Sequence, residues 1–403
     1  MNRSKLIRKL SYLGMVGALV LIGVGNALAE GGTVAEVYGH VMLDMGYQTG
    51  QSDPDWFDVM RPTKLPSFEN EYGQDGRFFS GVRQSRFGIK TDTATDMGQL
   101  KTIFEFELFG TGVDAGQTTF RLRHAYGELG KFGAGQTWSP FMDIGVFPNT
   151  LEYWGPNGMV FFRNVQLRWM PIQGDTHMTI ALERPGASGH PGEYQNGIEA
   201  NEVQARFSVP DLSAEYHLGT GFGYIELAGI LRQIQWDDLE DNDEDYSGTA
   251  TGWGLNLSTN INTGEKGTIR GQLVVGEGIA NYMNDATYDV AAVATTDPAK
   301  PVEGKALPVL GAVLFYDINW SPRWTSSLGY SMMDIDNVAG QDESEFSKGH
   351  YAILNLLYHP LPNVLMGLEG QYGKRENFED GFTSDDFRIQ FSAKYNFSTK
   401  IGG

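Results

Sequence analysis

The chain has 403 residues, no cysteine, and 50 acidic against 30 basic residues, which gives a formal net charge of -20. A helical membrane protein would show several apolar runs of roughly 18 or more residues, and only one segment, at the N-terminus, comes close to that. The hydrophobic fraction of 41% excludes a disordered chain, and the lack of cysteine excludes a disulfide scaffold or a Cys-ligated zinc site. The acidic balance argues against nucleic acid as a partner, because phosphates require clustered Lys and Arg.

The first 29 residues have the layout of an export signal. A basic start is followed by an apolar stretch from Leu10 to about Gly25 and by the small-x-small motif Ala27-Leu28-Ala29. We therefore predict a cleaved signal peptide over 1–29, with cleavage near Ala29 and a mature chain that starts at Glu30. A retained membrane anchor is the alternative interpretation.

From Glu30 onwards, apolar and polar residues alternate with the period of two that is typical of strands. In the last segment, Phe387, Ile389 and Phe391 alternate with Arg388 and Gln390. The pattern predicts sixteen strands, near 34–48, 77–91, 99–110, 118–131, 133–138, 162–171, 175–184, 201–218, 222–236, 251–263, 267–277, 308–320, 323–335, 349–359, 363–376 and 386–397.

The connections between these strands are alternately short and long, which is typical of an outer-membrane barrel with periplasmic turns and outer loops. A sheet in lipid must also close, because unpaired backbone groups cost several kcal/mol each. We therefore predict an all-β fold. Residues 30–403 form one 16-stranded antiparallel transmembrane β-barrel in a bacterial outer membrane, surrounded by lipid and lipopolysaccharide. A secreted soluble sandwich or β-helix is the alternative.

No catalytic motif is present in the sequence, so we expect no enzyme activity and no cofactor. G-x-S-x-G, H-E-x-x-H and Walker loops are absent, and the seven histidines are scattered singly. The acidic run Asp237–Asp245 resembles the start of a calcium loop, but Tyr246 stands where such a loop needs Gly. A solvated acidic loop and a weak calcium contact both remain open for this run. An enzyme or adhesin anchored by a barrel is the remaining alternative role.

If the alternating apolar residues face lipid, the residues between them face the lumen. Arginine facing lipid near the midplane would cost about 2–4 kcal/mol. The inner wall is then predicted to carry eight basic residues: Arg86, Arg121, Arg123, Arg168, Arg232, Arg270, Arg388 and Lys394. They would form a ladder for anions, or alternatively pair with Glu105, Glu107, Glu226 and Glu369 as ordinary lumen polarity.

Arg83 does not fit this alternation, because it shares a face with Phe79 and Phe87. A bulge, a rim position or a subunit interface would explain its position.

The connection 139–161 is too apolar for a free surface loop. We predict that it folds inward as a constriction loop, with Trp138 and Ser139 at its start, Asp143 and Glu152 as polar contacts, and Tyr153 and Trp154 among its aromatic residues. An aromatic interface anchor or a subunit contact is the alternative.

Several motifs resemble those of the DcaP-like outer-membrane porins. They are Gln84–Gly88, Arg121–Gly127, Gly135–Phe141, Glu152–Pro156 and Gly276–Ile279, and the resemblance spans nearly the whole mature chain. It implies homotrimeric barrels that admit small organic anions such as dicarboxylates, with Arg86, Arg121 and Arg123 as candidate constriction residues. The chain departs from the family in that the first predicted strand begins close to Glu30, without the coiled-coil segment of some members.

These observations together predict a passive outer-membrane porin for small anionic solutes. The alternative is a general, non-selective diffusion porin.

Overall fold

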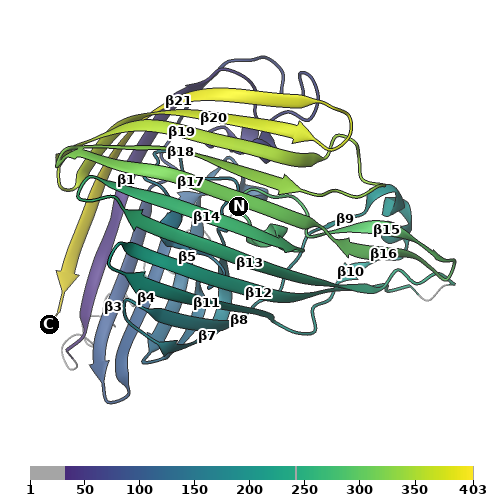
Figure 1. Cartoon of the computed structure of the whole chain (residues 1–403), viewed down its shortest axis with the longest axis horizontal. Helices are drawn as coiled ribbons and strands as arrows, with labels where there is room; N and C mark the ends of the chain where they lie inside the picture. Colours follow the sequence, from purple (N-terminus) through teal and green to yellow (C-terminus); the bar gives the residue numbers. More distant parts are fainter. Residues whose placement is uncertain (1–31, 241–242, 403) are drawn as a thin grey trace, which may run out of the picture.

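Sixteen long antiparallel strands form a closed barrel in the computed structural model, which describes residues 32–240 and 243–402 (Figure 1). Each strand pairs with its neighbours in the sheet, and the ring closes where the first strand pairs with the last from Ala35↔Ile401 to Gln48↔Arg388. The barrel strands are β1 (Val34–Gln48), β3 (Arg86–Thr95), β4 (Gly98–Phe109), β5 (Thr118–Leu129), β6 (Phe132–Trp138), β7 (Arg163–Ile172), β8 (His177–Glu183), β11 (Asp211–Thr220), β12 (Gly223–Asp237), β13 (Gly248–Asn262), β14 (Gly267–Glu277), β17 (Pro308–Ser321), β18 (Trp324–Ile335), β19 (Phe346–Leu361), β20 (Val364–Asn377) and β21 (Thr383–Ile401). The predicted fold is confirmed.

Two of the predicted strands are interrupted. Residues 77–91 form β2 (Arg77–Gly81) and then β3, both paired with β1, and residues 201–218 form the short β10 (Gln204–Ala205) and then β11. On β1, Asp44 faces Gly81 and His40 faces Arg86, so four residues, 82–85, lie opposite three residues of β1. The extra residue is a bulge, and it reverses which face each following side chain occupies.

The long connection 277–307 contains a hairpin that the alternation pattern did not predict. β15 (Val290–Asp297) pairs with β16 (Lys300–Ala306), and β9 (Gly189–His190) joins β15 in parallel to make a small three-stranded sheet. A short helix, α2 (Gln195–Ala200), follows β9 along the chain. In Figure 1 this sheet projects from the barrel end opposite the C-terminus, at the end that carries the long connections.

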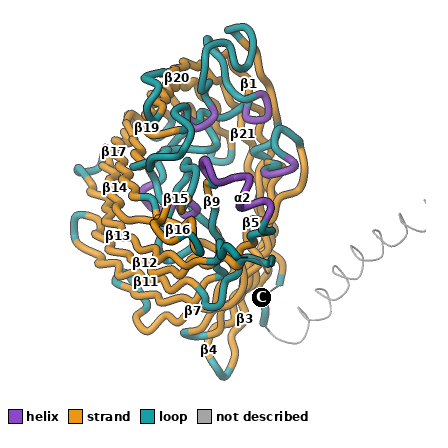
Figure 2. The backbone as a smooth tube through the Cα atoms, turned by 90° about the vertical axis from the view of Figure 1, so that its right-hand side faces the viewer, coloured by secondary structure: helices purple, strands orange, loops and turns teal. Residues whose placement is uncertain are grey.

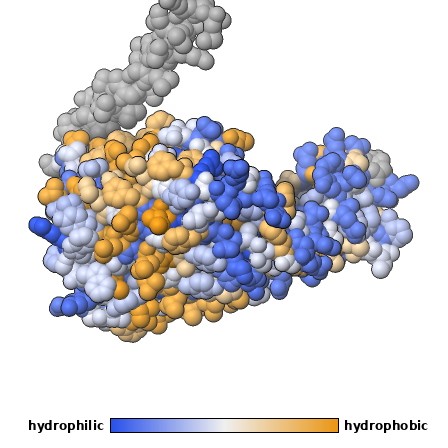
Figure 3. Space-filling view, turned by 90° about the horizontal axis from the view of Figure 1, so that it is seen from above, coloured by the Kyte–Doolittle hydropathy of each residue, from blue (hydrophilic) through white to orange (hydrophobic). Residues whose placement is uncertain are grey.

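The outer face of the barrel is a broad apolar belt. Along β13 the exposed Leu255 and Leu257 alternate with the buried Asn256 and Ser258, and the other barrel strands show similar alternation. Figure 3 shows apolar side chains over the barrel wall and hydrophilic ones over the projecting sheet. This distribution fits a wall that meets lipid and an end that meets water.

Three connections lie inside the barrel and pack against its inner face. They are 49–76, 139–161 and 278–289, and Figure 2 shows loops and short helices filling one side of the opening. Phe141, Val146 and Met159 of the second segment are fully buried with Met60 of the first and Tyr282 of the third. Together they cover inner-facing apolar residues of β14 and β17–β19, which are Val274, Phe315, Met333 and Tyr351. This region of the inner face is therefore apolar, because folded connections, rather than water, cover it.

No helix in the described residues is long and apolar enough to cross a membrane. The predicted signal peptide over 1–29 lies outside the described residues, as do Asp241 and Asn242 of the acidic run. The calcium contact considered for that run stays a prediction.

The lipid-facing position of Leu257 can be tested by substitution. We expect Leu257→Arg to lower the free energy of unfolding from bilayers by about 2–4 kcal/mol, because it places a guanidinium near the midplane. Ile261→Arg, on the same face at the turn end of the same strand, should cost only about 0–1 kcal/mol. Urea unfolding from lipid vesicles measures both values, and equal costs would contradict the assigned face.

Candidate functional site: the inner wall of the barrel

Four arginines gather around two glutamates on the inner wall formed by β3, β4, β5 and the start of β7. Arg123 donates to Glu105 at 2.6 Å and to Glu107 at 2.7 Å. Arg86 lies 3.3 Å from Glu107 and 3.7 Å from Glu105, and Arg121 and Arg163 lie 3.8 and 4.0 Å from Glu107. We call these six residues the arginine cluster. With four positive and two negative charges, it carries a surplus of two positive charges.

The arginines of this cluster differ in their access to water. The side chains of Arg86 and Arg121 are 26% and 29% exposed, whereas that of Arg123 is 5% exposed. The sequence pattern placed all three on the same face, but only the first two present their guanidinium groups to the lumen. The buried Arg123 instead holds the two carboxylates in place.

Backbone irregularities concentrate these side chains on the inner wall. In β5 the register shifts between Leu122, which faces Phe106, and His124, which faces Glu105, so Arg123 is an extra residue. As a result Arg121, Arg123 and His124 all project inward. Bulges commonly re-aim side chains in this way beside functional sites.

The bulge at 82–85 has the same effect on β2 and β3. Arg83 keeps the inward face that Phe79 and Gly81 hold in β2, and there it pairs with Asp58 at 2.5 Å and donates to the Gly110 carbonyl at 2.9 Å. The extra residue then brings Arg86 to the same inner wall. This is one of the three explanations that the sequence left open for Arg83.

Aromatic side chains line the arginine cluster. The Tyr153 hydroxyl donates to Glu107, and the Tyr153 ring stacks on Phe109 with centroids 4.0 Å apart. The guanidinium groups of Arg163 and Arg123 lie 4.8 and 5.5 Å from the centroid of Trp138. Cation–π contacts of this kind hold guanidinium groups in fixed orientations.

The remaining predicted basic residues lie elsewhere on the inner wall and do not join the arginine cluster. Arg168 donates to Gln166 and to the Trp138 carbonyl. Arg232 is fully buried between Asp211 and Asp289, at 3.0 and 2.7 Å. Arg270 pairs with Asp317 at 2.6 Å, and Arg388 donates to the Phe57 carbonyl beneath the segment 49–76. Lys394 forms no ion pair within the described residues.

The segment 139–161 is fastened to the inner wall by hydrogen bonds along its length. Ser139 donates to Glu183 at 2.6 Å, and Asp143 accepts from Tyr224 and Ser258, both at 2.7 Å. The Trp154 indole donates to the Asn284 carbonyl at 2.8 Å. Trp138 itself is the last residue of β6 rather than part of the segment.

Glu152 is the most heavily bonded residue of this segment. Its carboxylate accepts from the backbone N–H groups of Met60, Trp154 and Gly155 and from the Tyr351 hydroxyl, at 2.5 to 3.2 Å. Burial raises the pKa of Glu152 to about 8, although the backbone donors favour the charged form. It therefore anchors the segment and does not face the solute path.

A different part of the inner wall, around β8, β11 and β12, is acidic. Asp143, Glu183, Glu215 and Glu226 have no Lys or Arg ion-pair partner among the residues that the structure describes. The sequence predicts Asp143 as a loop contact and Glu226 as a partner for arginine, but Glu226 bonds His217 at 2.8 Å. The register across three strands, which determines this contact, is not visible in the sequence.

Arg163 of the arginine cluster, and Tyr38 and His124 beside it, could not be identified from the sequence. Tyr38 donates to Glu105 at 2.7 Å, and His124 shares a 3.0 Å hydrogen bond with Thr137. Arg163 is the first residue of β7 and faces Trp138 across the sheet. The alternation pattern is weakest at a strand end, so only the strand register could have revealed it.

The closed ring of sixteen strands, the apolar outer belt and the charged inner wall define a bacterial outer-membrane channel of the porin type. The model of the DcaP outer membrane protein family matches residues 28–397, and the chain belongs to this family. No match was found among curated proteins.

Solved structures share the fold. The crystal structure of the outer membrane channel DcaP of Acinetobacter baumannii is 20% identical, with a TM-score of 0.74 over 91% of this chain and 98% of that chain. An anion-selective porin from Comamonas acidovorans is 11% identical, with a TM-score of 0.57 over 91% and 100%. OmpT, an outer membrane protein of Vibrio cholerae, is 13% identical, with a TM-score of 0.55 over 91% and 98%. The family and the fold are those of outer-membrane channels rather than enzymes.

The structural importance of Glu107 gives a prediction. Its side chain is fully buried and lies within 4.0 Å of four guanidinium groups, so Glu107→Gln leaves buried charge without compensation. We expect the free energy of unfolding to fall by about 3–5 kcal/mol. Glu128→Gln, which removes a more exposed partner of Lys101, should cost about 0–1 kcal/mol in the same urea titration. A cost of only about 0–1 kcal/mol for Glu107→Gln would contradict the role of Glu107 in compensating the buried arginine charges.

Proposed function

We propose that the protein is a passive channel for small anionic solutes, such as dicarboxylates, and that Arg86 and Arg121 contact the solute. The observation that carries the proposal is the surplus of positive charge in the arginine cluster together with the exposure of these two side chains. Guanidinium groups bind carboxylates in a bidentate geometry, and rings of basic residues favour anions in pores.

The other basic residues have different roles in this proposal. Arg123 and Arg163 maintain the positive potential from buried positions, because their charge acts through a medium of low dielectric constant. β1 pairs with β3, which carries Arg86, on one side and with β21, which carries Lys394, on the other. Lys394, which forms no ion pair within the described residues, therefore adds its charge to the same side of the lumen. The described acidic residues of the run, Asp237, Asp238, Glu240, Asp243, Glu244 and Asp245, lie at or beyond the end of β12 that carries the projecting sheet (Figure 1), and charges more than roughly 8 Å away are largely screened.

The segment 139–161 acts in this proposal as the constriction loop. Its residue Tyr153 reaches the arginine cluster, whereas Asp143 reaches β12 and β13, so the segment spans the lumen between two charged regions. In this proposal the solute passes the segment on the side where the guanidinium groups of Arg86 and Arg121 are exposed.

We expect Arg121→Ala to lower the anion-over-cation permeability ratio by about fivefold. This is the effect of losing about 1 kcal/mol, the attraction between unit charges 4 Å apart in water. Flux of neutral sugars should not fall. Reversal potentials of single channels in a salt gradient measure the ratio. Arg206→Ala is the matched control, because Arg206 is exposed and pairs with Asp237 outside the lumen. A cation-preferring wild-type channel would overturn the proposal.

A general diffusion porin is the second candidate function, and one observation favours it. The acidic residues near β11 and β12 and the basic residues of β3–β5 occupy different parts of the wall, so the two sets produce a field across the lumen. In a general porin this field would orient solutes without selecting a sign. Equal flux of sugars and diacids of similar size would favour this function over the anion channel.

We also propose that the barrel assembles as a homotrimer. A trimer form has been solved for OmpT of Vibrio cholerae, which is 12% identical to this chain. The exposed apolar outer face would supply the contact between subunits. The mass of the purified protein in detergent, measured by sedimentation, should be that of three chains, and the mass of one chain would contradict the proposal.

A further inference from the structure

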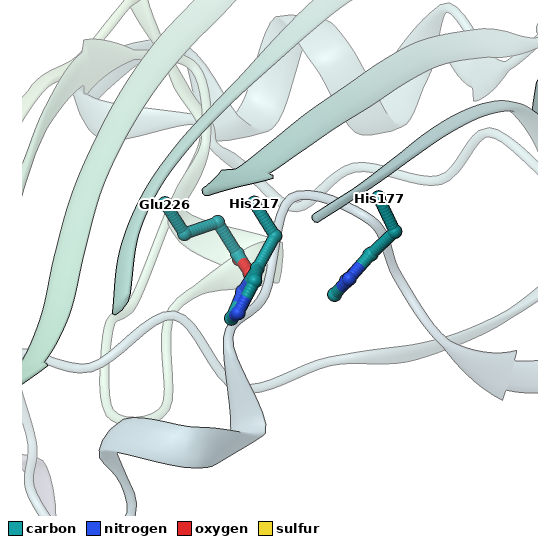
Figure 4. A group of neighbouring side chains, drawn as sticks. All are labelled: His177, His217 and Glu226. Carbon is teal, nitrogen blue, oxygen red and sulfur yellow. The ribbon is translucent and has the colours of Figure 1, made fainter. Parts of the chain in front are cut away.

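Two histidines and a glutamate lie side by side on the inner wall, near the short turns. His177 of β8 faces His217 of β11, and His217 faces Glu226 of β12, so the three residues form one row across adjacent strands. The histidine rings stack with centroids 4.3 Å apart (Figure 4). One donor atom from each of the three side chains lies within 4.8 Å of the others.

The hydrogen bonds of both rings leave one nitrogen free. Nδ1 of His217 lies 2.8 Å from the Glu226 carboxylate, and Nδ1 of His177 lies 3.3 Å from the Gly174 carbonyl. Neither ring accepts a hydrogen bond from a backbone N–H of the described residues, so the proton can sit on either nitrogen of each ring. Nδ1 of His217 and the Glu226 carboxylate can therefore share one ion when the proton of His217 is on Nε2, whereas His177 offers Nε2, with the Gly174 carbonyl as the second-shell oxygen on Nδ1 that is usual for histidine metal ligands.

Glu226 provides an independent indication of a ligand. Its side chain is only 5% exposed, yet its Oε1 atom has no hydrogen-bond partner, while Oε2 holds His217. A buried carboxylate oxygen without a partner is costly unless something fills its coordination. No Lys or Arg among the described residues pairs with Glu226, so a cation would supply the missing charge.

A second group that contains a histidine differs from the row of His177, His217 and Glu226 in the hydrogen bonds of its ring nitrogens. His190, Asp342 and Glu345 also lie close together, but Nδ1 of His190 accepts a hydrogen bond from the backbone N–H of Gly192. The ring proton is then on Nε2, which faces Glu345 at 3.0 Å. Neither nitrogen of His190 has a free lone pair, so that group is not a ligand set.

We propose that His177, His217 and Glu226 bind a divalent first-row transition metal ion such as Zn²⁺. Imidazole nitrogen and carboxylate oxygen are the ligands that these ions prefer, at about 2.0–2.2 Å. Donors on one ion lie about 3–3.5 Å apart at those lengths, so the group must close slightly on binding. The His177 side chain, 36% exposed and held by one long hydrogen bond, rotates to do so. Glu215, whose carboxylate lies 3.9 Å from Nε2 of His177, can supply a fourth ligand.

The site lies where an ion would change the lumen charge. Asp143 of the segment 139–161 bonds Tyr224, whose ring lies 4.2 Å from that of His217. A bound dication would offset the acidic residues of this wall and leave the arginine cluster as the dominant charge. The anion-over-cation ratio should therefore rise when the metal binds. This consequence rests on the proposed channel function, whereas the binding itself does not.

Copper binding to the purified full-length protein in detergent tests the site directly. Cu²⁺ alone serves as the probe, because imidazole sites bind it more tightly than the other first-row divalent ions. We expect one bound Cu²⁺ per chain whose electron paramagnetic resonance spectrum shows two nitrogen ligands. His177→Gln should leave a one-nitrogen spectrum, and Glu226→Gln should weaken binding by about 10–100-fold.

His190→Gln is the matched control. Like His217, His190 is bonded to a glutamate, but neither of its ring nitrogens has a free lone pair. This substitution should leave the two-nitrogen spectrum unchanged. A wild-type spectrum without nitrogen ligands, or loss of the signal in His190→Gln, would overturn the proposal. His217→Gln provides a second variant if His177→Gln does not fold, which heat-modified migration on gels reveals. Reversal potentials with and without Zn²⁺ then test the effect on selectivity separately.

Discussion

The need to pair every backbone N–H and C=O group within lipid is the constraint on which the rest of this structure depends. A sheet meets it only by closing, and closure fixes two faces for every strand. Leu227 and Leu257 face lipid across a strand pair, while Glu226 and Ser258, their neighbours, face inward. Within the membrane, charged residues of the strands are therefore confined to the inner face. The positive and negative side chains of sixteen strands meet inside one enclosed space, where they hold each other and set the potential that a solute meets.

One part of the barrel interior is filled by packed segments, and another part remains exposed. Segments 49–76, 139–161 and 278–289 cover an apolar part of the inner wall, and they do so with a core of Phe141, Met159 and Tyr282 like that of a soluble domain. Their polar contacts are made at the margins of this core, where Glu152 and Asp143 accept hydrogen bonds from the wall. The remaining wall, with Arg86 and Arg121, stays exposed. The three inner segments thus leave the charged part of the inner wall exposed, and the strands supply most of its charged side chains.

The strands and their faces could be predicted from the sequence because a period of two is a local property. Arg83 even marked the bulge, since by alternation alone it would share the apolar face of Phe87, but three explanations fitted that exception equally. The arginine cluster and the histidine row could not be predicted from the alternation of faces alone. Arg121 and Arg123 share a face in the sequence, and only the bulge opposite Glu105 makes one exposed and the other buried. Arg163 and the row from His177 to Glu226 depend on register between strands, which no local pattern encodes. The hairpin of β15 and β16 lies in the stretch 277–307, where the alternation pattern predicts no strand.

The pairing of β1 with β21 also sets the order of events during biogenesis. Ala35 meets Ile401, so the seam joins residues from opposite ends of the polypeptide. The cylinder cannot be sealed until the final strand has been translated and exported. Until then both outermost strands carry unsatisfied edges, and the apolar belt has no lipid around it. The unsealed chain must therefore be shielded during its transit of the periplasm, and a truncation that removes β21 would leave an edge that pairs with other chains.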